Sequence, residues 1–428
     1  MSADGLPALL PLADALAILR AQPECLGNET VLSGDAAGRV CAQDVVCPAP
    51  IPPHTGAGCD GFAVRARDVA AASPQAPMLL PVAGRTCCGE APLCGLPHTA
   101  REVFAGAALP SPYDAVVRYA DAGVVALQDA CRDDGEPTWI RLTAPVAAGT
   151  DVRRRGEDIA EGAVIAAAGR VLRPPHLMAL ATAGIERVVV RTQPRVAVLS
   201  TGRELVDDVR DALEPGQVRN SNAPYLVAML QRHGALPRYL RTVNDDRDEF
   251  QRSLAWASTH RYPLTISSGA TTAGREDFVG DVLLGLGAGL LFRGVAIQPG
   301  WPVLLARLPH GGLFLGLPGN PASCAACFRL FALPLLRVLN GLPPELPSTA
   351  LLATAVPRDP LRTRLLKARV QVSEGRRLVR PLPGQEPHRI APLLEANAWI
   401  LLPPGPAPAR DGDVVATLPM QDDWSRTA

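Results

Sequence analysis

The sequence has 428 residues, 47% hydrophobic and 20% charged, which is typical of a globular chain and excludes a disordered one. A chain of this length exceeds one ordinary core, so we expect two to four domains. The formal net charge is zero, so no overall basic field would recruit nucleic acid or an anionic membrane.

The first residues do not resemble a targeting segment. Asp4, Pro7, Pro11 and Asp14 interrupt any continuous apolar run. We therefore expect neither a signal peptide nor a transmembrane helix, and we interpret the chain as cytoplasmic.

The ten cysteines lack the regular spacing of a secreted disulfide framework. Cys324 and Cys327 form a C-x-x-C pair, but no second pair or histidine at ligand spacing lies near them in sequence. We predict that both are small apolar residues inside a helix.

The first half of the chain mixes short helices with β-type runs. Apolar spacing predicts a helix over 9–20, and the proline-rich stretch 48–53 marks a boundary or extended loop. A glycine loop then leads to a strand that begins after Asp60. From its position alone, Asp60 could simply be a turn residue before Gly61. Further predictions are a β-rich region from 78 to 149, an arginine-rich loop at 152–159, a helix at 172–184 and a strand at 188–190.

From residue 195 to about 341, strand and helix patterns alternate, which predicts a parallel, doubly wound α/β domain. Asn320 and Pro321 are typical of an N-cap and a first helical position. A proline-rich linker at 342–347 follows, and β-type runs at 368–372 and 399–402 predict a small C-terminal β-domain.

Three apolar runs in the α/β region break into glycine turns at 195–202, 264–269 and 313–319. Glu204 follows the first run, and Asp277 lies beyond the second. Ligands of open α/β sheets bind beyond the carboxyl ends of the strands, so we expect these loops to converge on the working site. Their backbone amides and helix starts offer a seat for an anion.

Seven motifs together resemble the molybdopterin molybdenumtransferase family, the molybdenum-inserting enzymes that include the C-terminal part of gephyrin. Each is weak alone, but they occur in the family's order over most of the chain. They are 60–64 (DGFAV), 104–110 (FAGAALP) with 114–117 (DAVV), 153–158 (RRRGED), 199–205 (LSTGREL), 215–222 (PGQVRNSN), 268–277 and 317–323 (LPGNPAS).

The resemblance implies an α/β multidomain protein with four parts. These are an elongated α+β domain I (1–50 and 150–190), an inserted β-rich domain II (51–149), an α/β molybdopterin-binding domain III (191–341) and a C-terminal β-domain IV (342–428). It also implies a homodimer whose site lies between the α/β domain of one subunit and the inserted region of the other. Other cofactor-biosynthesis proteins or acceptor enzymes are implied as further partners.

The family reaction takes adenylylated molybdopterin and molybdate and yields molybdenum cofactor and AMP with the help of Mg²⁺. By motif position, Asp60, Asp158, Glu204 and Asp277 are the catalytic candidates, and Glu204 and Asp277 are also the metal candidates, since carboxylates suit a hard cation. The candidates for the nucleotide and pterin groove are Thr201, Gly202, Asn220, Ser221, Asn222, Ser268, Gly269, Gly274, Pro318, Gly319, Asn320 and Ser323.

Some of these candidates have purely structural alternatives. Asn320 could serve only as an N-cap, Ser221 only as a turn residue, and Asp158 only as a partner of the neighbouring arginines.

The sequence also departs from the family pattern. Three lysines expected in the stretch 294–302 are replaced by Gly294, Gln298 and Trp301, which carry no charge to hold an oxyanion. Arg203, Arg275 and Arg293 could restore positive charge. Other departures are Thr55, Ala57, Ala105 and Ala270.

Two hypotheses follow from these departures. The first is a working transferase with a rearranged anion site, which the retained acids favour. The second is a catalytically degenerate paralogue that binds molybdopterin or partner proteins without inserting metal. A third option, an unrelated nucleotide-binding α/β protein, would make the flanking β-domains coincidental.

Overall fold

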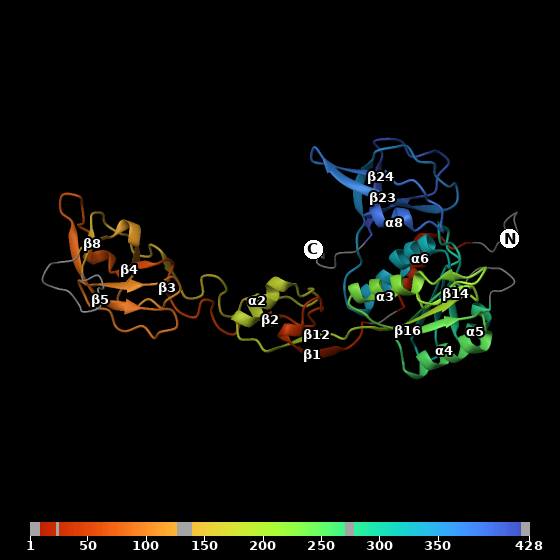
Figure 1. Ribbon diagram of the computed structural model, residues 1–428, viewed down its shortest axis with the longest axis horizontal. Coiled ribbons are helices and arrows are strands. Elements are labelled where there is room, and N and C mark those ends of the chain that lie inside the picture. Colours follow the sequence, from red (N-terminus) through yellow and green to blue (C-terminus); the bar gives the residue numbers. More distant parts are fainter. Residues whose placement is uncertain (1–8, 23–24, 126–138, 270–277, 421–428) are drawn as a thin grey trace. The chain divides into compact units, whose positions relative to one another are not determined.

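The computed structural model describes residues 9–22, 25–125, 139–269 and 278–420. Contacts between residues divide the chain into two compact units (Figure 1). The first unit comprises Met1–Gln43, Ala168–Pro174 and Arg187–Ala428. The second unit comprises Asp44–Ala167 and Pro175–Glu186.

A mixed sheet forms the centre of the first unit. Its strands, in spatial order, are β16 (Leu236–Val243), β13 (Arg195–Thr201), β17 (Leu264–Ser268), β21 (Leu313–Leu317), β20 (Leu304–Arg307) and β18 (Gly289–Arg293). The first four are parallel, as the sequence predicts. β20 runs antiparallel to β21, and β18 runs antiparallel to β20 and so in the direction of the first four. The connection from β20 to β21 is too short for a crossover, and this fixes the antiparallel direction.

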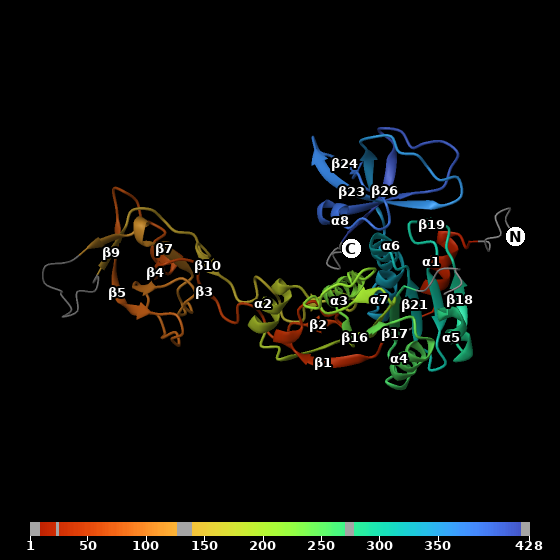
Figure 2. The same ribbon diagram turned by 45° about the vertical axis from the view of Figure 1, so that its right-hand side comes forward.

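Helices cover both faces of this sheet (Figure 1; Figure 2). They are α3 (Asn222–Arg232), α4 (Arg247–Thr259), α5 (Val279–Gly285), α6 (Pro321–Cys327) and α7 (Leu333–Leu339). α3, α6 and α7 pack into one apolar core, and α4 and α5 pack into another. Two cores on opposite faces confirm the predicted doubly wound α/β arrangement.

A continuous helical segment, Pro321–Leu339, joins α6 to α7 through a π-helical turn at Phe328–Ala332. Its mean hydropathy of 1.6 would suit a membrane span, but 89% of the apolar window is buried inside the structure. It is therefore the core helix of the first unit. Cys324 and Cys327 are fully buried in it, and this confirms their prediction as apolar helix residues.

The amphipathic helix α1 (Leu12–Arg20) begins later than the predicted start at residue 9. Pro11 occupies the N-cap position, and Leu10 forms an isolated bridge with Val295 instead. Beyond α1, β1 (Asn28–Leu32) pairs antiparallel with β12 (Arg187–Arg191), and a 3₁₀ turn spans Ser33–Asp35.

The C-terminal part of the first unit is a second six-stranded sheet. In spatial order its strands are β19 (Ile297–Gln298), β23 (Thr363–Ser373), β24 (Arg376–Pro381), β22 (Ser348–Leu352), β26 (Val414–Pro419) and β25 (Ala398–Leu402), and α8 (Ala391–Glu395) accompanies them. The predicted C-terminal β-runs are thereby confirmed. Lys367, the only lysine in the sequence, lies on β23 with 1% of its surface exposed. Its Nζ donates to the carbonyl oxygens of Glu386 and Arg389, at 3.2 Å each.

The second unit is β-rich, as predicted for its central region. Its main sheet, in spatial order, contains β7 (Ala115–Arg118), β4 (Gly61–Val64), β6 (Ala100–Val103), β5 (Met78–Thr86), β9 (Trp139–Leu142) and β8 (Gly123–Val125). Shorter pairs join β10 (Val152–Arg153) to β3 (Gly56–Ala57) and β11 (Val164–Ala166) to β2 (Val45–Val46). The remaining elements are 3₁₀ turns at Ala66–Asp68 and Tyr119–Asp121 and the helix α2 (Pro174–Thr182).

Candidate functional site

The predicted convergence of loops is present at the carboxyl edge of the parallel strands. β13, β17 and β21 are adjacent and in register, with Ser200 opposite Ser268 and Ser268 opposite Leu317. The loops that follow them surround a cavity of about 720 Å³, here called the acidic pocket. Its lining contains the predicted residues Thr201, Gly202, Glu204, Asn220, Ser221, Asn222, Ser268, Gly269, Gly319 and Asn320.

A second cavity of about 550 Å³, here called the arginine pocket, shares Gly319 and Asn320 with the first. The predicted residues Pro318 and Ser323 line this second cavity. Of the other predicted positions, Asp60 and Asp158 belong to the second unit, and Gly274 and Asp277 lie outside the described residues.

Two glycines let the strand ends approach each other closely at the acidic pocket. At Gly269, with a φ of 98°, a Cβ atom would lie 2.3 Å from the carbonyl oxygen of Thr201. At Gly202, with a φ of 149°, a Cβ atom would lie 2.8 Å from both carboxylate oxygens of Glu204. Glycine therefore gives the Glu204 carboxylate room to fold back over the end of β13.

Asp245 is a pocket carboxylate that sequence reasoning missed. It follows β16, lines the acidic pocket with Glu204 and has a positive φ of 53°. The backbone N–H of Arg203 donates to its Oδ2 at 3.0 Å. Strand β16 contains Arg238, Arg241 and other polar residues, so it lacks the continuous apolar run that marked the other strand ends. The only sequence signal for this part of the site was the acidic residue Asp245 shortly after the strand.

The segment between Glu204 and α3 is held by short-range pairing. β14 (Leu205–Val206) and β15 (Val218–Arg219) run parallel, and Val218 N–H donates to the carbonyl oxygen of Glu204 at 2.8 Å. This pairing brings Asn220, Ser221 and Asn222 to the pocket wall.

Asn220 and Asn222 are both largely buried, and both side-chain amides donate to protein groups. The Asn220 amide donates to Asp207 Oδ1 at 2.9 Å, and the Asn222 amide donates to the carbonyl oxygen of Gly319 at 2.7 Å. The Ser221 side chain makes no capping hydrogen bond to α3, because the Asn220 Oδ1 accepts from Ala223 N–H instead.

The turn at Gly319 and Asn320 separates the two pockets. Asn320 occupies the predicted N-cap position of α6 in extended geometry, but its side chain makes no capping hydrogen bond. Its exposed amide can therefore face a ligand. Behind the turn, the N–H of Ala322 donates to the Pro387 carbonyl oxygen at 2.9 Å, which links α6 to the C-terminal sheet domain.

The arginine pocket contains the positions where the family pattern expects lysine. Gln298 and Trp301 both line it, and so do Arg362 and Arg364 at the start of β23. Its other charged lining residue is Glu386. Positive charge in this cavity therefore comes from the C-terminal sheet domain.

Two of the three arginines suggested from sequence as replacements do not supply that charge. Neither Arg203 nor Arg293 lines either pocket, and the Arg293 guanidinium lies against Gly280 in α5. Arg275 lies outside the described residues.

In the second unit, Asp60 and Asp158 are both exposed. Asp60 precedes β4, and its Oδ1 accepts from Ala105 N–H at 2.7 Å. In the 153–158 loop the arginines contact Glu157 rather than Asp158, since Glu157 accepts from Arg153 Nε and from Arg154 N–H. No described contact supports the alternative that Asp158 only pairs with the arginines.

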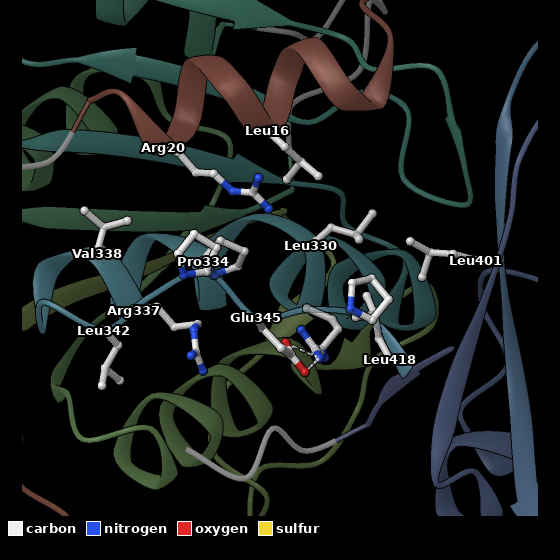
Figure 3. Close-up of a pocket in the computed structure, with 13 residues that line it drawn as sticks. Leu16, Arg20, Leu330, Pro334, Arg337, Val338, Leu342, Glu345, Leu401 and Leu418 are labelled. Carbon is white, nitrogen blue, oxygen red and sulfur yellow. Dashed lines mark hydrogen bonds and ion pairs between the residues drawn. The ribbon is translucent and has the colours of Figure 1, made fainter. Parts of the chain in front are cut away.

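A third cavity, shown in Figure 3, does not fit a charged substrate. Its volume is about 80 Å³, and its lining is mostly apolar, including Leu16, Leu330, Leu401 and Leu418. The Glu345 carboxylate at its edge is paired with the buried Arg329 guanidinium at 2.6 Å. We therefore place the candidate site at the acidic pocket and the arginine pocket, which contain the residues predicted from the sequence.

Comparison with known proteins identifies the family. A curated molybdopterin molybdenumtransferase from Synechococcus elongatus is 35% identical over 383 residues, covering 89% of this chain and 91% of the relative. The chain belongs to the molybdopterin molybdenumtransferase family. A second relative of that name, from Bacillus subtilis, is 32% identical and covers 92% of this chain and 90% of the relative. The resemblance inferred from the motifs is confirmed.

Three family descriptions match successive parts of this transferase-family chain. Residues 10–184 match the MoeA N-terminal region (domain I and II), 197–338 match a probable molybdopterin binding domain, and 349–420 match the MoeA C-terminal region (domain IV). Two solved structures of the molybdopterin biosynthesis protein moeA from Pyrococcus horikoshii, 28% and 26% identical, each have a TM-score of 0.76. They cover 97% and 96% of this chain and all of theirs, and the predicted fold class is thereby confirmed.

Proposed function

We propose that this protein inserts molybdenum from molybdate into adenylylated molybdopterin and releases AMP. The observation that carries the proposal is the pair of adjoining pockets. The acidic pocket combines Glu204 and Asp245 with glycine-rich turns, and the arginine pocket presents Arg362 and Arg364. Such a pair can hold a pyrophosphate-linked nucleotide beside an oxyanion.

The carboxylates of the acidic pocket suit a divalent cation such as Mg²⁺. Glu204 and Asp245 supply hard oxygen ligands, and substrate phosphates and water commonly complete such a site. When bound, the cation would add positive charge beside the pyrophosphate.

The chain's own groups would bind and orient the substrates. The exposed side chain of Asn320 would hold phosphate oxygens, since the N–H groups of Gly202 and Gly269 already donate to the carbonyl oxygens of Val243 and Leu317. Arg362 and Arg364 would hold molybdate in the neighbouring cavity, in place of the family's lysines.

The proposed assembly extends to the second unit and to the whole chain. We propose a cytoplasmic homodimer in which Asp60 and Asp158 of the partner complete the site, and in which Asp277 joins Glu204. The proposal also keeps the four domains, with the boundaries predicted from the sequence. Acceptor enzymes or other cofactor-biosynthesis proteins would take up the product.

One observation favours a second candidate function, a paralogue that binds molybdopterin without inserting metal. Gln298 and Trp301 occupy the arginine pocket as neutral residues, so this cavity has fewer positive charges than the family pattern expects. Arg362 and Arg364 argue for the active enzyme.

The deciding experiment is AMP release from adenylylated molybdopterin in the presence of molybdate. We expect release by the wild type and a loss of about 100-fold or more in Glu204→Ala, the scale seen when one preorganised electrostatic group is removed. Glu214→Gln, an exposed acid outside both pockets, is the control. Tight molybdopterin binding without AMP release would support the binding paralogue instead.

A further inference from the structure

Asp207, which has no predicted role and lines neither main pocket, is an exposed residue whose carboxylate contacts Asn220 in the wall of the acidic pocket. Its carboxylate accepts four hydrogen bonds. Thr242 donates from its N–H to Oδ2 at 3.0 Å and from its hydroxyl to Oδ1 at 2.6 Å. The Tyr239 hydroxyl donates to Oδ1 at 2.8 Å, and the Asn220 amide at 2.9 Å.

These contacts tie the end of β16 to the segment that enters α3. Tyr239 and Thr242 belong to β16, whereas Asn220 follows β15. Burial would raise the pKa of Asp207, but the hydrogen bonds from Thr242, Asn220 and Tyr239 outweigh it and hold the pKa below its usual value. The carboxylate is therefore ionised at neutral pH, and charge-assisted hydrogen bonds are the stronger kind.

The negative charge also fixes which way the Asn220 amide points. Its NH₂ group faces Asp207, so its carbonyl oxygen faces α3 and accepts from Ala223 N–H at 3.1 Å. That bond satisfies one of the free amides at the start of the helix. One residue before Ala223, Asn222 donates to the Gly319 carbonyl oxygen in the turn between the two pockets.

We propose that Asp207 is a positioning residue that sets the substrate-facing segment 220–222 and, through Asn222, the turn at Gly319. This inference rests on the proposed function. Asp207 acts through Asn220 and touches no substrate itself. Asn220 correspondingly serves as a link between Asp207 and α3, and the exposed groups around it contact the ligand.

The direct test is Asp207→Asn, which keeps the size of the side chain but removes its charge. Whichever way the new amide turns, its NH₂ group faces a donor, either Thr242 N–H or the groups at Oδ1. We expect the KM for adenylylated molybdopterin to rise at least about tenfold while kcat changes by less than about twofold. An unchanged KM in a folded Asp207→Asn protein would overturn the proposal.

Asp208→Asn is the matched control. Asp208 is the adjacent acid, its carboxylate contacts only the exposed Arg210 among the described residues, and it lines neither main pocket. Its substitution should leave KM within about twofold of the wild type. A KM effect equal to that of Asp207→Asn would mean that general loop charge, rather than the Asn220 link, is responsible, and would refute the proposal.

A double-mutant cycle tests the route through Asn220. If Asp207 acts through this amide, Asp207→Asn should change KM by less than about twofold in an Asn220→Ala background. Full additivity of the two effects would contradict the inference.

Hydrogen exchange separates failure of this inference from failure of the proposed function. Peptides covering 218–226 should exchange at least about fivefold faster in Asp207→Asn than in Asp208→Asn, while peptides from β23 and β24 stay unchanged. If the wild type releases no AMP, the proposed function fails, yet exchange and titration with AMP still test the positioning role. Unchanged exchange and unchanged AMP affinity would overturn it.

Discussion

The two pockets that meet at Gly319 and Asn320 differ in the charge of their walls and in the origin of that charge. The acidic pocket takes Glu204 and Asp245 from loops of the α/β domain. The arginine pocket takes Arg362 and Arg364 from the start of β23, in the C-terminal sheet. Each pocket is therefore suited to a different part of the substrate set.

The difference teaches that the carboxylates of one wall and the arginines of the other come from separate parts of the fold, so each set can change independently of the other. The carboxylates lie on loops after parallel strands, which the sheet holds in register. Gln298 and Trp301 belong to the segment that reaches the C-terminal sheet through β19, and Arg362 and Arg364 line the same cavity. The predictions below probe this division.

The largest expected effect is the loss of stability on replacing Gly269, a glycine that lines the acidic pocket but not the arginine pocket. Gly269→Ala would place a Cβ atom 2.3 Å from the Thr201 carbonyl oxygen at a φ of 98°. We expect a loss of about 2–4 kcal/mol of stability, combining backbone strain with overpacking. Thermal unfolding measures it.

The control for this prediction is Gly412→Ala. Gly412 has a similar φ of 84° but open space around its Cβ position, so only strain of about 1 kcal/mol is expected. Equal losses of stability in the two variants would show that the close approach at Gly269 does not contribute to the cost of the substitution.

The next effect concerns the arginine pocket alone. Arg362→Met and Arg364→Met should each raise the molybdate concentration for half-maximal AMP release about tenfold, or about 1.4 kcal/mol, with nucleotide affinity unchanged. Arg377→Met, on the exposed face of β24, should behave as the wild type. Weaker nucleotide binding with normal molybdate dependence would contradict the assignment of molybdate to the arginine pocket and of the nucleotide to the acidic pocket.

A smaller effect should follow from restoring one expected lysine. Gln298→Lys adds a charge to an exposed position of the arginine pocket, and we expect molybdate affinity to improve about threefold to fivefold, or about 1 kcal/mol at most. Gln371→Lys, exposed on β23, is the control. A loss of affinity would indicate that this chain has become selective for a different oxyanion.

The smallest effect is a dependence of stability on pH. Because the pKa of Asp207 is lowered in the folded state, its contribution is present above the ordinary aspartate pKa and is lost as the pH falls through the lower, folded value. The difference in melting temperature between the wild type and Asp207→Asn should therefore be constant above about pH 5 and shrink below about pH 4. Asp411→Asn, an exposed acid, should show no such change attributable to this network.

The sequence allowed a site residue to be predicted where that residue directly follows a recognisable strand. Glu204, Gly269 and Gly319 each follow an apolar run, and adjacent parallel strands bring their carboxyl ends together without further information. Register within such a sheet is fixed by the buried faces, so the convergence was predictable.

The missed residues depend on contacts between distant segments. Asp245 follows a polar edge strand, and Arg362 and Arg364 reach the site only because β19 pairs with β23. The engagement of Asn220 by Asp207 depends on side chains from β16. The local sequence pattern does not predict these contacts.

The solitary lysine has a practical consequence. Since Lys367 is almost fully covered and its Nζ donates to two backbone carbonyl groups, its side chain is shielded from amine-reactive reagents in the folded protein. A fluorophore should therefore couple to Lys367 only when the C-terminal sheet opens, and the rate of that coupling would report the unfolding of this domain.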